Sequence, residues 1–377
     1  MGILVWLIVV NVAVFIHELA HYAAARVQGV NVKAFSVGMG PILARKTWRG
    51  TEWRLSALPI GGYVDIEGLA PTEMDDKGKP IPPTTGMARL GFWGKFAILF
   101  AGPLSNILLA IVLVAVMLSG QGRPSAGDSL RFLIVQPNSK AESVGFKTGD
   151  VIVAIDGKRL LPEGFDKLAP SDPKRLEQAD AAAKTVRENL RGNGSRTYTI
   201  SRGDPRNAVL LEYKFDWSPT TFGDQARPLF GVSIGLETVY TPVGFLPALG
   251  ESATNLIGSI PGTVQAIIGG IFNTFTLQRD PNLAGPVGTV NVAGQVAQQG
   301  FWQVLFFAGL INLSLGVFNL LPIPGLDGGR ILLSAIVALR RKPFAPGQEE
   351  TINFAGFVFV IIFIVLVTVQ DFGRLGR

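Results

Sequence analysis

The two histidines of this chain lie four residues apart in one apolar segment. The chain has 377 residues and only two His, and both occur in Phe15–Ala23, which reads FIHELAHYA. In a helix this spacing puts His17 and His21 on one face, where both can reach one ion. Glu18 points to a different side of the helix, so it can contact a metal-bound water without binding the ion itself. His-Glu-x-x-His on a helix is typical of zinc hydrolases, with the Glu as general base.

Two alternatives to a metal site are that these are ordinary helix residues or that the segment is a cleaved signal peptide. The run from Gly2 to Ala25 is apolar apart from Asn11 and these three residues. It is long enough to span a bilayer, which takes about 20 residues. Ionisable groups at membrane depth are costly and usually functional. A signal peptide is disfavoured because no Lys or Arg precedes the run and Glu18 would lie just before the cleavage site.

A zinc site of this type needs a third protein ligand and keeps one position open. The chain has no further His and no Cys, so the third ligand must be Asp or Glu. Asp327 is the candidate, in the stretch NLLPIPGLDGG that begins at Asn319. From this stretch alone, Asp327 could equally be a helix N-cap or a turn residue. Zinc is the predicted cofactor.

Polar and helix-breaking residues occur in two further apolar segments. Asn106 and Asn319 are expected at the depth of the histidines. Either they hydrogen-bond helix to helix, or they hold the substrate backbone or a developing oxyanion; both interpretations stay open. Gly102 and Pro103 interrupt the start of the second segment. Irregular backbone at that depth is tolerated where protein buries it or a water-filled cavity lies beside it.

The composition predicts that part of the chain lies in lipid. It is 48% hydrophobic and 16% charged, with mean hydropathy +0.35, whereas soluble domains are about 25% charged. The net charge of +6 suits a membrane surface. We expect no nucleic-acid partner, because no basic stripe or binding motif is present. The lack of Cys excludes disulfides, thiolate metal sites and Cys nucleophiles.

The elements that position these residues are about four apolar spans. We expect spans over residues 2–25, 96–118, 301–321 and 352–370, so that the membrane core comprises residues 1–121 and 301–377. A β region is predicted over residues 30–68, where TEWRLSALPIGGYVDI alternates in polarity and ends near Gly61 and Gly62.

Residues 122–220 are predicted to form an inserted α+β domain. Strand-like segments at 131–136 and 150–157 precede a helix at 174–192, which Gly192 ends. We predict a membrane-surface linker with an amphipathic helix over 221–300. Its apolar part, 256–272, contains Pro261 and three glycines, so it is expected to lie on or dip into the membrane.

The positions of Lys and Arg predict the orientation. The loop between the first two spans is rich in both, and so is the stretch after the third span, which makes both cytoplasmic. The termini and the inserted domain then lie outside. His17, His21, Asn106 and Asp327 converge in one layer towards the cytoplasm. A full crossing by residues 256–272 would place Asp327 on the opposite side.

The motifs HELAH, GPLSN and NLLPIPGLDGG, in this order, resemble the site-2 protease family of intramembrane zinc metalloproteases. The closest resemblance is to its bacterial RseP-like branch, which has four spans and an outward PDZ region. The resemblance implies that His17, His21 and Asp327 bind zinc, that Glu18 is the catalytic base, and that the motif asparagines lie near the active site. It also implies a multi-pass protein of the bacterial inner membrane.

Other stretches extend the resemblance. FSVGMGP and LPIGGYV, the latter with Gly61 and Gly62, resemble a membrane-associated β region that pairs with an unwound substrate. NSKAESVGFKTGDVIVAIDGKRL resembles a bacterial PDZ domain, with an extra stretch, Leu161–Pro173, before its helix. Such domains are thought to admit substrates already trimmed outside by a site-1 type protease. The implied substrates are single-span proteins such as anti-sigma factors and signal-peptide remnants.

Two functions of other classes remain as alternatives. One is a catalytically inactive membrane PDZ adaptor or chaperone with a structural metal site, which would have no need of Glu18 as a base. The other is an ion transporter. The large outward domain and the lack of further charge within the spans argue against transport.

Overall fold

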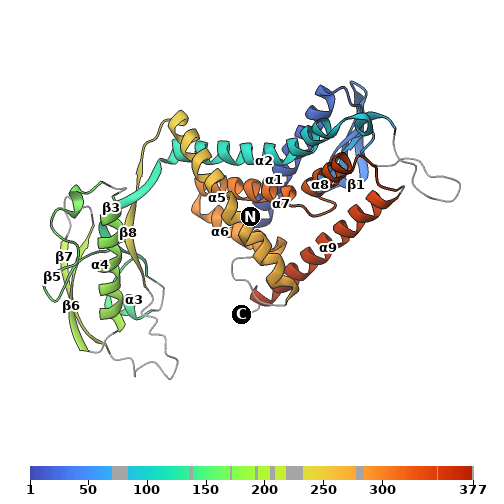
Figure 1. Ribbon diagram of the computed structural model, residues 1–377. Coiled ribbons are helices and arrows are strands. Elements are labelled where there is room, and N and C mark those ends of the chain that lie inside the picture. The colour runs from blue at the N-terminus through green and yellow to red at the C-terminus, as the bar shows by residue number, and fades with distance from the viewer. Residues whose placement is uncertain are drawn as a thin grey trace. The chain divides into compact units, whose positions relative to one another are not determined.

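The fold comes from a computed structural model that describes residues 1–69, 84–135, 139–169, 172–191, 194–203, 209–217, 232–276, 284–345 and 347–375. It has two compact units (Figure 1). The first unit comprises Met1–Gly120 and Val243–Arg377, and the second comprises Gln121–Pro242.

The first unit is mainly helical. Its helices are α1 (Gly2–Val27), α2 (Phe92–Gln121), α5 (Phe245–Phe275), α6 (Pro286–Gln299), α7 (Phe301–Leu320), α8 (Asp327–Arg340) and α9 (Gln348–Leu375), with a short 3-10 turn at Gly86–Arg89. Among the described residues, α1, α2, α5, α7 and α9 are long and apolar enough to cross a bilayer. These helices make the fold compatible with a multi-pass membrane protein.

Helix α5 differs from the prediction. The sequence predicts four spans and an interrupted segment at 256–272, whereas α5 is a continuous helix of 31 residues that runs through Pro261 and is a fifth candidate span by length and composition. Proline removes one helical hydrogen bond, but packing overrides this local preference. Ala248 and Leu256 are buried in a cluster with residues of α2 and α7.

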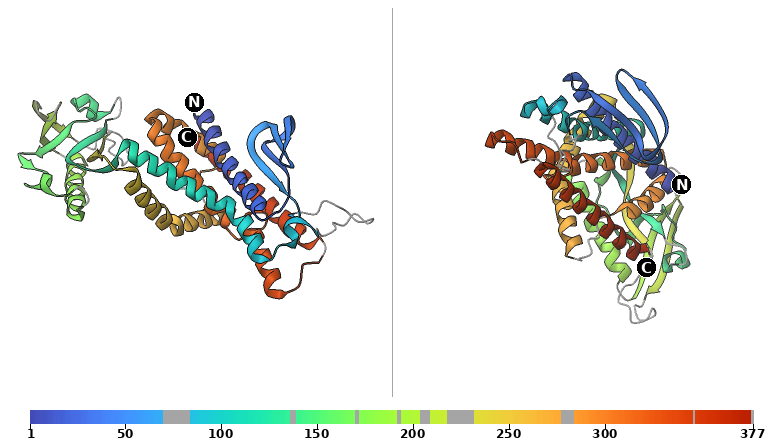
Figure 2. Two further views of the ribbon diagram at one scale, coloured as in Figure 1. Left: turned by 90° about the horizontal axis from the view of Figure 1, so that it is seen from above. Right: turned by 90° about the vertical axis from the view of Figure 1, so that its right-hand side faces the viewer.

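Helices α1 and α7 run in the same direction, and α2 runs antiparallel to both. A Cβ on Gly316 of α7 would lie 2.8 Å from the Pro103 carbonyl of α2, and one on Gly309 would lie 2.8 Å from the Val114 side chain. Near its start α1 packs on the first half of α7, where Val9 shares a cluster with Phe307. The N-terminal part of α2 therefore lies beside the C-terminal part of α1 (Figure 2).

The two long strands of the first unit, β1 (Val32–Trp48) and β2 (Thr51–Ile66), form a hairpin within the predicted 30–68 region. Its turn has positive φ at Arg49 and Gly50, as type I′ hairpin turns require. Residues 34–37 have partners on both sides, at 62–65 and at 52–55. The segment 62–66 is therefore an outer edge of this sheet, and β2 packs beside α1 (Figure 2).

The second unit is a twisted sheet with one covering helix. Its strands are β3 (Arg123–Val135), β4 (Val151–Ile155), β5 (Lys158–Arg159), β6 (Gly194–Arg202), β7 (Val209–Trp217) and β8 (Val232–Thr241); its helices are α3 (Lys140–Val144) and α4 (Pro173–Arg191), with a 3-10 turn at Phe165–Lys167. The sheet order is β7-β6-β4-β3-β8, and β5 pairs with β4. Phe132, Phe146 and Val186 lie in its core. The strands and helix predicted from the sequence contain or overlap β3, β4 and α4.

The second unit ends later than predicted. The sequence places its end at residue 220, but β8 pairs antiparallel with β3 from Arg123↔Thr241 to Val135↔Val232 and completes the sheet. The prediction assigned β8 to the linker because this edge strand is separated in sequence from its partner. Of the predicted linker, residues 221–231 and 277–283 lie outside the described residues.

Candidate active site

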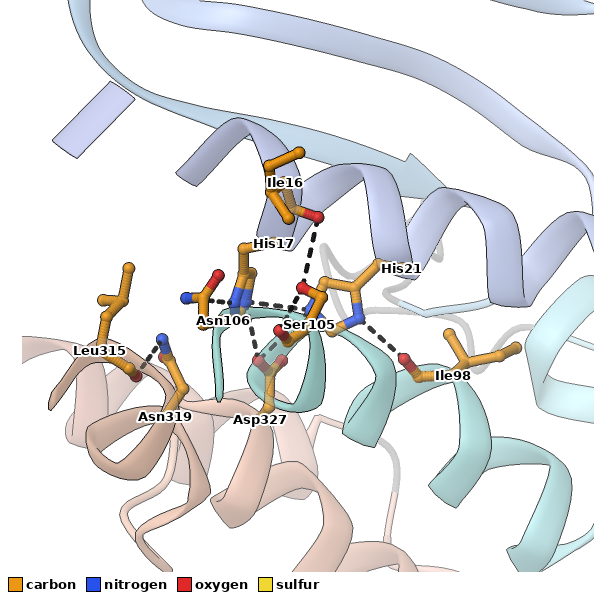
Figure 3. Close-up of polar contacts among 10 residues, drawn as sticks. Ile16, His17, His21, Ile98, Ser105, Asn106, Leu315, Asn319 and Asp327 are labelled. Carbon is orange, nitrogen blue, oxygen red and sulfur yellow. Dashed lines mark hydrogen bonds and ion pairs between the residues drawn. The ribbon is translucent and has the colours of Figure 1, made fainter. Parts of the chain in front are cut away.

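His17, His21 and Asp327 converge at one point in the first unit (Figure 3). Among the described residues, they form a group whose possible ligand atoms all lie within 4.8 Å of one another. Asp327 Oδ2 lies 3.1 Å from His17 Nε2 and 3.3 Å from His21 Nε2, and the two Nε2 atoms are 3.1 Å apart. Both histidines are buried. The histidines come from α1, and the aspartate comes from the start of α8.

The geometry fits a tetrahedral zinc ion. Bonds of about 2.0–2.1 Å place neighbouring ligand atoms about 3.3 Å apart, close to the separations of 3.1–3.3 Å here. Gly102 of α2 leaves the space beside these atoms empty. A Cβ there would overlap His21 Nε2 and lie 2.8 Å from His17 Nε2. The predicted interruption at Gly102 and Pro103 is wrong for the backbone, because α2 runs as one helix from Phe92 to Gln121 with Pro103 inside it. Gly102 instead leaves space over the ligand atoms.

Asp327 is the first residue of α8, and Leu326 is the N-cap. The alternative that Asp327 is an N-cap is therefore wrong for this helix. Its carboxylate points to the histidines (Figure 3). Helix α7 ends at Leu320, and the Pro-containing segment that follows brings the chain back to α1.

A backbone carbonyl sets the orientation of His21. Its Nδ1–H donates to the Ile98 carbonyl of α2 at 2.8 Å, which leaves the Nε2 lone pair free for a metal. A backbone acceptor carries no side-chain motif, so the role of Ile98 could not be predicted from the sequence.

Asn106 contacts the other histidine. It is fully buried, and its Nδ2 lies 3.3 Å from His17 Nδ1 (Figure 3). Its Oδ1 has no hydrogen-bond partner among the described residues. The sequence left open whether Asn106 serves helix packing or the substrate. The structure links it across helices to a predicted metal ligand.

Glu18 lies beside the ligand group and is not one of its members. Its carboxylate is half-buried and accepts a hydrogen bond from the Val64 backbone of β2. Gly62 makes this approach possible, because a Cβ there would lie 2.7 Å from the Ser36 carbonyl and 3.9 Å from Glu18 Cγ. Gly61 has φ +79°, which favours glycine. The edge of β2 therefore borders the candidate base.

The remaining motif residues lie next to the site. Asn319 donates to the Leu315 carbonyl at 3.1 Å, one turn back in its own helix (Figure 3). Ser105, which was not among the predicted site residues, has its Oγ 2.7 Å from the Gly102 carbonyl and 3.3 Å from the Ile16 carbonyl, so both carbonyls share its one hydroxyl proton. It thereby joins α2 to α1 within the site. Its position beside Asn106 in GPLSN was the available signal.

Comparison with known proteins gives the family. The model of peptidase family M50 matches residues 5–363. A protein of Rhizobium meliloti (strain 1021) named "putative zinc metalloprotease" is 32% identical, with 97% of this chain and 95% of the relative covered. Proteins of the same description from Agrobacterium fabrum and Campylobacter jejuni are 31% and 30% identical, covering 98% of this chain and 95% and 92% of their own lengths. The resemblance found in the motifs is confirmed: the chain belongs to peptidase family M50, the site-2 protease family of zinc-dependent peptidases.

Proposed function

We propose that this chain is an intramembrane zinc endopeptidase that cleaves single-span membrane proteins. The observation that carries the proposal is the convergence of His17, His21 and Asp327 beside Glu18, in a unit built from helices apolar enough to cross a bilayer. Membership of family M50 supports the same reaction.

The roles of the residues follow from their positions. Bound zinc supplies a Lewis acid that polarises the scissile carbonyl and lowers the pKa of water. His17, His21 and Asp327 would hold the ion, because their possible ligand atoms lie within 4.8 Å of one another. Glu18 accepts the proton of the attacking water and returns it to the leaving amine, the usual task of a positioned carboxylate. Asn319, whose amide donates to Leu315 of its own helix, would hold the substrate backbone in this proposal.

Substrate pairs with the edge of the hairpin. Segment 62–66 is an outer edge of the sheet, and the Val64 backbone contacts Glu18. A strand added there forms main-chain hydrogen bonds that do not depend on sequence. A substrate helix must unwind first, because its carbonyls are bonded within the helix. The edge therefore holds an extended peptide beside the base, with Gly62 next to Glu18 and Gly61 next to Met39.

The packing supports four crossings, by α1, α2, α7 and α9. Because α1 and α7 run in the same direction and α2 runs oppositely, the chain between α2 and α7 starts and ends on the same side. Helix α5 then enters the membrane without crossing it. At its C-terminal end Phe275 stacks on Phe359, midway along α9. Helix α6 begins beside the C-terminal end of α9, because the N–H of its N-cap, Gly285, donates to Asp371.

The orientation follows the distribution of Lys and Arg. The region between α1 and α2 and the stretch after α8 are rich in both, which places them in the cytoplasm. The active site then lies towards the cytoplasmic side of a bacterial plasma membrane, and the second unit lies outside.

The second unit is a PDZ domain in this proposal. A groove of about 350 Å³ lies between edge strand β8 and helix α4, with Ile234 and Leu236 on the strand side and Leu176 and Ala183 on the helix side. PDZ domains bind peptides beside such an edge strand. In this family the domain would restrict entry to substrates that an upstream site-1 type protease has shortened, such as anti-sigma factors and signal-peptide remnants.

Replacing Glu18 with Gln tests the proposal. With a tagged single-span reporter and the full chain in a bilayer, we expect Glu18→Gln to lower the cleavage rate by about 10²–10⁴-fold with zinc retained. Glu188→Gln, on an exposed part of α4, should cleave like the wild type. Unchanged cleavage by zinc-loaded Glu18→Gln would favour another mechanism, and no cleavage by any form would favour the inactive adaptor.

A further inference from the structure

We propose that Asn106 is a positioning residue whose side-chain oxygen accepts the Nδ1–H of His17 when zinc is bound. This inference rests on the zinc site proposed above and assigns Asn106 a task other than substrate binding. The role consists in presenting the Nε2 lone pair of His17 to the ion.

The contacts of Asn106 identify this task. It is fully buried, its amide lies 3.3 Å from His17 Nδ1, and its oxygen has no partner among the described residues. A buried amide oxygen without a partner is costly. Rotation of the Asn106 amide by half a turn brings its oxygen next to His17 Nδ1. The oxygen can then accept a hydrogen bond from the Nδ1–H. A neutral imidazole that donates from Nδ1 has its lone pair on Nε2, which is the atom that faces Asp327 and His21.

The two histidines are held by different kinds of partner. The Ile98 carbonyl can only accept, so His21 keeps its Nδ1–H whether or not zinc is present. An amide can donate or accept. In the orientation with Nδ2 towards Nδ1, His17 carries its proton on Nε2 and donates it to Asp327 at 3.1 Å. Zinc binding requires the other tautomer of His17, and the amide reverses with it.

The change of His17 between two tautomers explains why an amide, which can donate or accept, suits position 106. A leucine would fill a similar volume but would leave the His17 Nδ1–H without an acceptor. An aspartate would accept this hydrogen bond but could not donate in the zinc-free state. Partners of this kind fix the tautomer and the ring orientation of metal-binding histidines, and their loss typically weakens metal binding by about 10–100-fold.

The first experiment measures zinc affinity by chelator competition on the full chain in detergent. We expect Asn106→Leu to weaken zinc binding by about 10–100-fold, and Asn106→Asp to bind zinc at least as tightly as the wild type. The matched control is Asn312→Leu. Asn312 is also buried, and its amide oxygen has no partner in the part of the chain that the structure describes, but its amide nitrogen donates to the Ala308 carbonyl of its own helix. This control should bind zinc like the wild type.

The second experiment observes the histidines directly. Because the chain has only two His, ¹⁵N-histidine labelling gives one Nδ1–H signal from each in the zinc-loaded protein. Asn106→Asp should shift one signal and leave the other in place. This readout reports the His17 tautomer and does not depend on activity or on overall stability.

The outcomes separate this inference from the proposed site. Retained zinc affinity in Asn106→Leu, equal losses in Asn106→Leu and Asn312→Leu, or equal losses in Asn106→Leu and Asn106→Asp would each overturn the role of the oxygen. His17→Ala should lose zinc entirely. If His17→Ala binds zinc like the wild type, the proposed ligand set itself fails.

Discussion

The two units bury polar groups in different ways. In the second unit, the buried Asp150 receives both Nε–H and Nη2–H of Arg202 at 2.6 Å and the Lys147 N–H at 2.8 Å. The Asp150 carboxylate and these three donors complement each other within the second unit. In the first unit, the possible ligand atoms of His17, His21 and Asp327 all lie within 4.8 Å of one another. Buried polar groups that complement each other stabilise a fold, whereas His and Asp side chains whose ligand atoms converge on one point are typical of a metal site.

The largest expected effect comes from filling the space over the ligands. Gly102→Ala places a methyl group against His21 Nε2 and His17 Nε2, so we expect this variant to lose zinc and cleavage together. Bound zinc is measured by metal analysis after gel filtration. Gly258→Ala is the matched control, because a Cβ at this helical glycine meets nothing within 4 Å. Full zinc content in Gly102→Ala would contradict the position assigned to the ion.

A smaller effect is expected where the hairpin meets the base. Gly62→Ala brings a methyl group 2.7 Å from the Ser36 carbonyl of β1 and 3.9 Å from Glu18, so the edge strand must shift relative to β1 and to Glu18. Misplacement of this size can cost about 10²-fold in rate, and we expect a loss of about 10–100-fold with zinc retained. Reporter cleavage and zinc content are measured on the same sample. Normal cleavage by Gly62→Ala would show that the β2 edge does not position the substrate.

The smallest effect concerns the second unit alone. Asp150→Ala removes the acceptor of two charged hydrogen bonds from Arg202, so the unit should lose about 1.5–3 kcal/mol of stability. Hydrogen exchange of peptides from β4 and β6 measures this loss in the full chain. Zinc affinity should stay unchanged. A fall in the zinc affinity of Asp150→Ala would contradict the view that the polar groups of the second unit play no part in metal binding.

The sequence predicted the residues that carry chemistry better than the elements around them. His17, His21 and Asp327 are identifiable because ionisable groups are rare in apolar segments, and the hairpin follows from its alternation. The Ile98 carbonyl could not be found, because backbone acceptors leave no mark in the sequence. Helix α5 was underestimated because Pro261 and its glycines suggest breaks that packing on α2 and α7 overrides. Strand β8 was missed because its partner β3 lies about 100 residues earlier in the chain.

The most direct test of the account is the zinc content of Asp327→Ala beside that of the wild type. The wild-type chain, purified in detergent and dialysed against a weak chelator, should keep about one zinc ion per chain. Asp327→Ala should keep none while the helices stay folded by circular dichroism, because two histidines alone leave the site without its third ligand. Full zinc retention in Asp327→Ala would contradict the convergence of α1 and α8 on one metal ion.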